Sequence, residues 1–292
     1  MSTAGIAGLS PAAVPAGRRR AWPRSALPGL RPTLGLTLLW LSLLVLLPLT
    51  GLLLRPWEIG LDGVWRVVTE PRALAALRLS FGAAILAALI DLPLGLLVAW
   101  ALVRYRFPGR RLLDAMVDLP FALPTAVAGL ALVALYAPNG WLGAPLSAIG
   151  VQVAYSRAGV VMALIFVGLP FVVRTLEPVL LDLPGEAEEA AATLGATRLQ
   201  TLRHVVLPAV APALLTGFSL AFARAVGEYG SVIFIAGNTP MVSEIAPLVI
   251  VTRLEQYDYA GAAAIGLTML ACSFLLLLLL NLFGRRLRPR TA

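Results

Sequence analysis

The chain has 292 residues, of which 59% are hydrophobic and 13% are charged. Soluble globular proteins carry about 25% charged residues, so the composition excludes that class and indicates an integral membrane protein. All 23 basic residues are arginine, and there is one histidine and one cysteine, which excludes a P-loop or Schiff-base lysine, a Cys/His metal site and an internal disulfide.

Two terminal segments differ from the rest of the chain. Residues 1–33 are rich in Ala, Pro and Arg and lack apolar periodicity, which predicts a disordered basic tail in the cytoplasm. Residues 285–292 are predicted to form a second, short cytoplasmic tail. Between them, residues 34–284 are predicted to form one transmembrane domain.

Six apolar segments in this domain are long enough to cross a bilayer, for which a helix needs about 20 residues. They are residues 34–54, 76–102, 112–137, 158–181, 209–236 and 259–283. The sequence therefore predicts an all-α integral membrane protein with six transmembrane helices.

Arginines in the short loops predict the orientation of these helices, because cytoplasmic loops carry an excess of positive residues. The N-terminal tail has five arginines, and residues 103–111 and the C-terminal segment have four each. The loops at 138–157 and 237–258 have one arginine each, whereas 55–75 has three, which weakens the assignment there. Both termini are then predicted to lie in the cytoplasm. The net charge of +8 favours anionic lipid head groups over nucleic acid as the partner of these arginines.

Charged residues within the predicted spans are candidates for the translocation path, because a charge that faces lipid costs about 2.5–3.5 kcal/mol or more. Asp91 lies in the second span and Asp118 in the third, although Asp118 is close to a predicted membrane face. Arg174, near the cytoplasmic end of the fourth span, is interpreted as an interfacial anchor. The third span also contains Pro120–Pro124, the best candidate for irregular backbone at membrane depth.

The cytoplasmic segment between the fourth and fifth spans has the pattern of two short helices. Pro184 suits the first turn of a helix that Asp182 is placed to cap. Gly195 suits the left-handed turn that ends this helix, and Thr197 begins the S/T-x-x-Q spacing of a capping box for the next one. Pro208 is predicted to stop or kink the second helix. Both a hairpin lying on the membrane and a docking element for a cytoplasmic partner fit this pattern.

Arg224 and Glu228 lie four residues apart near the middle of the fifth predicted span, on one face of the helix. The two charges must face the protein interior or a water-filled cavity rather than lipid. Two interpretations stay open: a fixed ion pair that locks helices together, or a pair at the translocation path or gate that changes partners between inward-facing and outward-facing states.

A characteristic spacing runs through the cytoplasmic segment, residues 182–208. The residues that define it are Glu189, Ala190, Ala191, Gly195, Val205, Leu207 and Pro208. This spacing resembles the EAA loop of ABC-importer permeases, EAA-x3-G-x9-I-x-LP, with Val in place of Ile. The resemblance implies that the loop is a coupling helix that docks on an ATPase subunit, in a permease of the type I ABC-importer architecture. It also implies that this chain binds no cofactor and that a separate ATPase chain uses ATP and Mg²⁺.

Three further segments carry a more specific resemblance. They are RYRFPGRRLLDAMVDLPFALPTAVAGLAL at 104–132, FARAVGEYGSVIFIAGN at 222–238 and LEQYDYAGAAAI at 254–265. They resemble the oxyanion permeases, and among these the sulfate/thiosulfate subunit more than the molybdate one. The resemblance implies a permease subunit that moves sulfate or thiosulfate across the bacterial inner membrane by alternating access.

The expected partners are a second permease subunit in a heterodimer, two ATP-binding subunits and a periplasmic sulfate/thiosulfate-binding protein. A homodimer and a molybdate or tungstate permease of the same family stay open as alternatives. A stand-alone secondary transporter is a further alternative, although the sequence has no convincing internal repeat of the kind many such transporters show. A membrane enzyme is disfavoured, because the sequence has no Ser/His or His/Glu constellation for catalysis.

Overall fold

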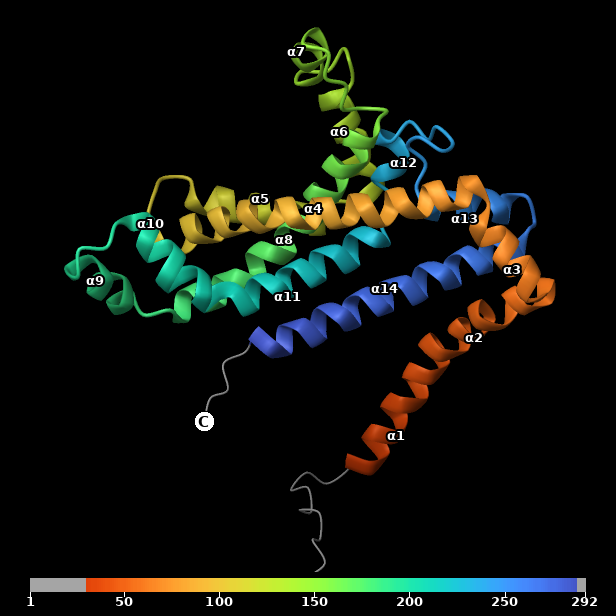
Figure 1. Ribbon diagram of the computed structural model, residues 1–292, viewed down its shortest axis with the longest axis horizontal. Coiled ribbons are helices and arrows are strands. Elements are labelled where there is room, and N and C mark those ends of the chain that lie inside the picture. Colours follow the sequence, from red (N-terminus) through yellow and green to blue (C-terminus); the bar gives the residue numbers. More distant parts are fainter. Residues whose placement is uncertain (1–29, 288–292) are drawn as a thin grey trace, which may run out of the picture. The chain divides into compact units, whose positions relative to one another are not determined.

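The computed structural model describes residues 30–287, and the regular elements in this range are all helices (Figure 1). The all-α class predicted from the sequence is confirmed. Within the described range, five helices are long and apolar enough to cross a membrane, and a bent pair of helices makes a sixth candidate span. The predicted tails lie mostly outside this range, at 1–29 and 288–292. The chain divides into two units, residues 1–50 and 51–292, and each is described by itself.

The first helical segment begins at Leu30, inside the predicted N-terminal tail. It consists of α1 (Leu30–Leu41), the π-helical turn η1 (Ser42–Leu46) and α2 (Leu47–Leu54). In η1 the Leu47 N–H donates to the Ser42 carbonyl, one residue further back than in an α-helix. Pro48 follows this wide turn. Since proline lacks an N–H and its ring clashes with the carbonyl four residues back, the wide turn lets the helix pass Pro48 without breaking.

The long helices of the second unit agree closely with three predicted spans. After η2 (Arg55–Ile59) and α3 (Gly60–Thr69), α4 (Pro71–Arg104) covers the second span, α8 (Arg157–Asp182) the fourth and α14 (Tyr259–Leu287) the sixth. A shorter helix, α13 (Ala246–Glu255), precedes α14. Because α14 continues through residues 285–287, the helix extends into the predicted C-terminal tail.

The core of the second unit is formed by α4, α8 and α11 (Leu207–Val226), which pack along one another (Figure 1). The buried face of α4 consists mainly of small residues, which lets backbones approach closely in a membrane protein. A Cβ atom on Gly95 would lie 2.6 Å from the Val172 side chain, and one on Gly217 would lie 3.1 Å from the Val172 backbone. Val172 of α8 therefore occupies space that glycines on both neighbouring helices leave free.

The third predicted span is broken. It consists of α5 (Arg110–Ala122) and α6 (Thr125–Tyr136), which meet at an angle of 117°. The break lies at Leu123 and Pro124, at the end of the Pro120–Pro124 segment for which irregular backbone was predicted, whereas Pro120 itself lies inside α5. The short helix α7 (Gly143–Ala148) follows in the loop after α6.

The fifth predicted span, 209–236, is wrong at both ends. The helix begins earlier, with α10 (Arg198–Thr201) and the π-turn η3 (Leu202–Val206), and α11 ends at Val226. A turn follows, and then the short helix α12 (Val232–Ile235), which lies against α6. A Cβ on Gly129 of α6 would lie 2.4 Å from the Ser231 carbonyl oxygen, so the turn crosses α6 too closely for any side chain there. A Cβ on Gly230 would lie 2.1 Å from Thr125 Oγ1, so the turn also lies against the first residue of α6, next to the break in the third span.

Candidate functional site

The segment that resembles the EAA loop forms two helices at one end of the core, where α4 ends and α8 leads into α9 (Figure 1). The first, α9 (Gly185–Thr193), begins after Pro184, which occupies the N-cap position without a side-chain hydrogen bond. The cap predicted at Asp182 is wrong, because Asp182 is the last residue of α8. Gly195 has a φ of +81° and ends α9 in the left-handed conformation predicted for it. Its N–H donates to the Ala192 carbonyl at 3.0 Å.

Thr197 caps the second helix as predicted. Its side chain accepts from the Gln200 N–H, and the Gln200 side chain accepts from the Thr197 N–H at 2.7 Å, which completes the capping box. Pro208 was predicted to stop or kink this helix, and the stop is contradicted. The π-turn η3 lies directly before Leu207 and Pro208, with the Leu207 N–H donating to the Leu202 carbonyl, so the helix continues into α11.

Residues 193–200, from the end of α9 into α10, present apolar side chains to the outside. Leu194 is 88% exposed and Leu199 is 73% exposed, and Glu189 and Ala190 are exposed on α9, whereas Ala191 is half-buried. Large exposed leucines of this kind indicate a surface that lipid or another protein covers. Both interpretations, a hairpin lying on the membrane and a docking element, stay open.

Arg104, the last residue of α4, ties the loop to the core. Its guanidinium donates to the Glu188 carboxylate at 2.7 Å and to the Leu183 carbonyl at 3.1 Å, and it lies over the Trp100 ring, 5.6 Å from the centroid. In the sequence, Arg104 contributes only to the prediction of the orientation of the spans. No local pattern could have found this contact, because the two charged partners are 84 residues apart.

Arg224 and Glu228 form an ion pair, with 2.6 Å between Nη1 and Oε2. They do not lie in the middle of a helix as predicted: Arg224 is in the last turn of α11, and Glu228 lies in the turn beyond it. The other oxygen of Glu228 accepts from both the N–H and the hydroxyl of Ser231, each at 3.0 Å. The Glu228 side chain is only 2% exposed, whereas that of Arg224 is 35% exposed. Glu228 therefore closes the turn at the end of the fifth span.

Asp91 is fully buried where α4 meets α8 and α11. Both carboxylate oxygens lack a hydrogen-bond partner among the described residues. A Cβ on Gly168 of α8 would lie 2.3 Å from Asp91 Oδ2, and 3.5 Å from the Ala221 Cβ of α11. In this packing Asp91 is enclosed by helices and is separate from the Arg224–Glu228 pair. Whether it lines the path in another state stays a prediction.

Asp118 binds Arg174, which links the broken third span to α8. Arg174 donates to both oxygens of Asp118, at 2.9 and 2.6 Å, and to Asp114 and Glu177, each at 2.7 Å. The predicted anchor is thus the centre of a cluster in which three carboxylates surround one guanidinium. Asp118 and Asp91 thus lie against different positions of α8, Arg174 and Gly168, and the roles proposed for them in the path stay untested.

A second set of ion pairs lies at the opposite end of the core, where α4 begins. Arg72 donates to both oxygens of Glu244, at 2.8 and 2.6 Å, and Arg253 pairs with Glu70 and with Asp258. These pairs neutralise arginines of the loops at 55–75 and 237–258. The excess of arginine that weakened the predicted orientation at 55–75 is thus partly offset by carboxylates.

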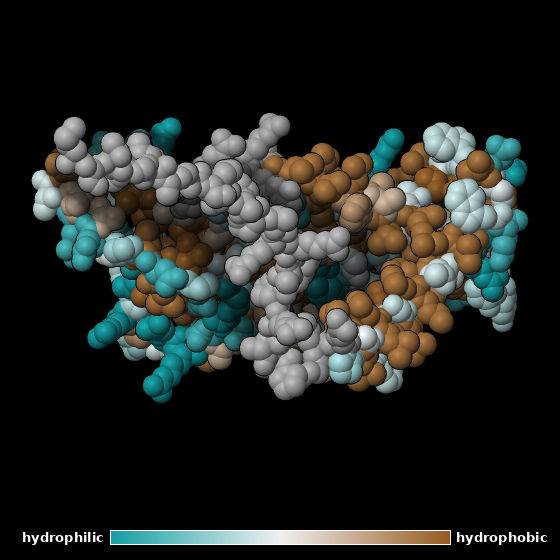
Figure 2. Space-filling model, turned by 90° about the horizontal axis from the view of Figure 1, so that it is seen from below, coloured by the Kyte–Doolittle hydropathy of each residue, from teal (hydrophilic) through white to brown (hydrophobic). Residues whose placement is uncertain are grey.

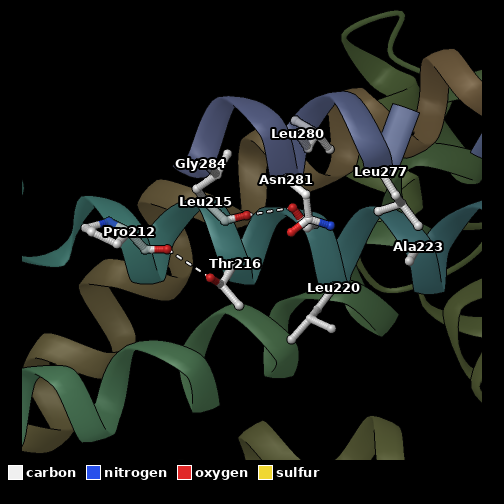
Figure 3. A pocket seen from close by; sticks show the side chains of 10 residues that line it. Pro212, Leu215, Thr216, Leu220, Ala223, Leu277, Leu280, Asn281 and Gly284 are labelled. Atoms are coloured by element: carbon white, nitrogen blue, oxygen red, sulfur yellow. Dashed lines mark hydrogen bonds between the residues drawn. The ribbon is translucent and has the colours of Figure 1, made fainter. Parts of the chain in front are cut away.

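A groove between α11 and α14 has a volume of about 480 Å³ (Figure 3). The Thr216 and Ser219 hydroxyls at this groove donate to carbonyls of their own helix, at 2.9 Å from Pro212 and 2.8 Å from Leu215. The groove is lined by apolar and uncharged side chains, so it cannot hold an anion by charge. Large areas of hydrophobic side chains are also exposed elsewhere (Figure 2), as expected of a surface covered by lipid or by other subunits.

Comparisons with known proteins agree with this geometry. A family model described as "Binding-protein-dependent transport system inner membrane component" matches residues 91–291. The chain is 50% identical over 253 residues to the sulfate transport system permease protein CysT of Synechocystis sp., covering 86% of this chain and 88% of the relative. It is 49% identical over 267 residues to the CysT of Salmonella typhimurium, covering 90% and 96%.

Two solved structures share the fold. A bacterial alginate ABC transporter, in complex with an alginate-bound periplasmic protein, matches with a TM-score of 0.72 at 20% identity and covers 88% of this chain and 94% of that chain. The MetNI methionine ABC transporter matches with a TM-score of 0.57 at 18% identity and covers 75% and 99%. With the family model and these relatives, the chain belongs to the binding-protein-dependent transport system inner membrane components, the permease subunits of ABC importers.

Proposed function

We propose that the chain is the membrane-spanning permease subunit of an ATP-driven importer that moves sulfate or thiosulfate into the cell by alternating access. The observation that carries the proposal is the identity of 49–50% to sulfate transport permeases over 86–90% of this chain. The chain is a transport subunit rather than an enzyme. It has no lysine for a P-loop, so ATP and Mg²⁺ are used by a separate ATPase chain.

The loop α9–α10 is placed to transmit the movement of the ATPase. It follows α8 directly at its start, continues through η3 into α11 at its end, and is bound to the last residue of α4 through Arg104 and Glu188. Each of the three core helices therefore has a direct link to the loop α9–α10. When ATP binding draws the ATPase subunits together, the displacement of α9 reaches all three helices at once and opens the path on the opposite side.

The proposed complex contains a second permease subunit, because one subunit forms only one wall of a path. The second subunit is proposed to be a different chain, which gives a heterodimer on two ATP-binding subunits, served by a periplasmic sulfate/thiosulfate-binding protein. Both termini and the coupling loop lie on the cytoplasmic side of the inner membrane in this arrangement. The arginines between the end of α4 and the start of α5 support it, because Arg106, Arg110 and Arg111 make no ion pair within the described residues.

Uptake of radiolabelled sulfate tests the proposal. The chain is expressed with its own partner subunits in a bacterial strain that lacks sulfate uptake, with thiosulfate and molybdate as unlabelled competitors. We expect uptake that thiosulfate inhibits and that is lost when the P-loop lysine of the partner ATPase is replaced. Uptake of molybdate alone would contradict the substrate, and uptake that survives the ATPase variant would indicate a secondary transporter instead.

A further inference from the structure

A hollow of about 320 Å³ lies at the end of the core opposite the coupling loop. It is lined by two arginines from different helices, Arg78 of α4 and Arg157 of α8, together with Met241 and Val242 from the loop before α13. Its lining contains no acidic side chain. At about 30 Å³ per water molecule, the hollow has room for a small oxyanion and part of its hydration shell.

Arg78 lies in the membrane-spanning part of α4, about 10 Å along the helix from Pro71 at about 1.5 Å per residue. Its side chain is exposed, and it has no hydrogen bond or ion pair within residues 30–287. The other arginines in spans, such as Arg174 and Arg224, hold carboxylates. An unpaired charge inside a span is costly when it faces lipid, so Arg78 indicates an aqueous space or a bound anion.

Arg157 is held in place from the opposite side of the hollow. Its Nε donates to the Val242 carbonyl at 2.6 Å, and its two terminal nitrogens make no hydrogen bond among the described residues. The loop that supplies this carbonyl is rigid: Met241 has a φ of +62°, and the Thr239 carbonyl accepts the N–H groups of the three residues after Met241. The Arg157 guanidinium is thus oriented by protein while its terminal donors stay available.

Positive charge at the hollow is not offset by its surroundings. Arg157 is the first residue of α8, where the helix dipole is already positive, so the pair of charges is unfavourable without an anion. Glu244, on the same loop as Val242, is bound through both oxygens by Arg72. Guanidinium groups donate to oxyanions through two parallel hydrogen bonds, which makes arginine suited to a tetrahedral anion.

We propose that Arg78 and Arg157 form a binding site for the transported oxyanion at the outer end of the permease, where the anion enters after release from the binding protein. The identity of the anion as sulfate rests on the proposed function. Two arginines without a carboxylate attract the anion, and the open hollow keeps the site weak enough for the anion to leave toward the path.

The test uses the complete importer in proteoliposomes, with its ATPase, partner permease and binding protein. The variants are Arg78→Gln, Arg157→Gln and Arg78→Lys, with Arg66→Gln as the matched control, since Arg66 is exposed on α3 and outside the hollow. Binding of labelled sulfate to the complex without binding protein is measured beside transport and basal ATP hydrolysis. We expect each Gln variant to weaken binding about tenfold or more, Arg78→Lys to weaken it less, and the control to be unchanged.

Three results would overturn the inference. Wild-type binding and transport in both Gln variants would mean that Arg78 only extends to the lipid interface. Loss of the partner permease from purified Arg78→Gln complexes would mean that Arg78 pairs with a carboxylate of that subunit. If the wild type takes up a different oxyanion, the proposed function is wrong, and binding to the variants is then measured with that anion. Unchanged binding of that anion to both Gln variants would exclude a site at Arg78 and Arg157.

Discussion

Replacing Arg224 and Glu228 together separates a structural role of this pair from a role at the gate. The single change Arg224→Met leaves a carboxylate that is 2% exposed without its counter-ion, and breaking such a pair costs about 3–5 kcal/mol when both partners are buried. Because Arg224 is partly exposed, we expect the lower end of that range. This is a large part of the stability of a typical domain, so the amount of folded complex falls.

The structure also determines which double variant is informative. An apolar residue at position 228 would leave the N–H and hydroxyl of Ser231 without their acceptor, at about 1–3 kcal/mol for a buried group. Glu228→Gln keeps an oxygen for Ser231 and removes the charge. In the double variant Arg224→Met/Glu228→Gln, no charge is left unpaired and the turn keeps its hydrogen bonds, so we expect stability to return to within about 1–2 kcal/mol of the wild type.

The assay is uptake of labelled sulfate per folded complex, with thermal stability of the purified complex measured in parallel. Because Glu228 is saturated by Ser231 and Arg224, we expect the double variant to transport at close to the wild-type rate while Arg224→Met is poorly folded. A double variant that is as stable as the wild type but does not transport, or that hydrolyses ATP without uptake, would refute this reasoning and assign the pair to the gate.

Three further predictions concern the coupling loop and the core. Gly195→Pro cannot adopt the φ of +81° and loses the N–H that donates to the Ala192 carbonyl. We therefore expect normal membrane insertion but loss of ATPase co-purification, whereas Gly195→Asn, which tolerates this conformation, should retain most of the ATPase. Equal co-purification of the two variants would show that docking does not depend on the left-handed turn at Gly195. Arg104→Ala is expected to lower transport several-fold with little change in stability, since its ion pair with Glu188 is partly exposed. Transport-coupled ATPase activity at the wild-type level would show that the contact between Arg104 and Glu188 does not transmit the movement of α9. Gly168→Ala is expected to destabilise the complex by about 1–3 kcal/mol, because the added Cβ clashes with Asp91. The second change Asp91→Ala should then restore the melting temperature. A melting temperature that stays low in the double variant would show that the clash with Asp91 does not cause the loss of stability.

Local patterns predicted the coupling loop well because its structure depends on neighbours in sequence. The left-handed turn at Gly195 needs only a residue without a Cβ, and the capping box at Thr197 needs only a partner three residues away. The predicted spans were similarly accurate where one apolar helix crosses the core without interruption. Pro208 does not stop the helix, because a wide turn before it removes the clash that proline otherwise makes.

The end of the fifth span could not be found from hydropathy. Residues 227–236 are nearly as apolar as the helix before them, so the mean hydropathy of the segment predicts a continuous span. Mean hydropathy carries no information on the hydrogen bond from the Ser231 N–H to Glu228 that closes the turn. Gly227 and Gly230 were the available signals. The contacts of Arg104 and Arg174 join residues 56–84 positions apart, so they depend on the tertiary fold. Arg78 was different: it lies inside the second predicted span, and the argument applied to Asp91 would have identified it.

The wide turn η3 also sets the rotational phase between the coupling loop and the core. A π-turn adds one residue to the helix, and one residue corresponds to about 100° of rotation at 3.6 residues per turn. A helical wheel that treats residues 198–226 as one regular α-helix is therefore in error by about 100° between α10 and α11. It places residues of the two helices on one face that in the structure point in different directions. Deleting one residue within 202–206 would turn the coupling loop by about a quarter of a circle relative to α11, and it would also remove the wide turn that lets the helix pass Pro208.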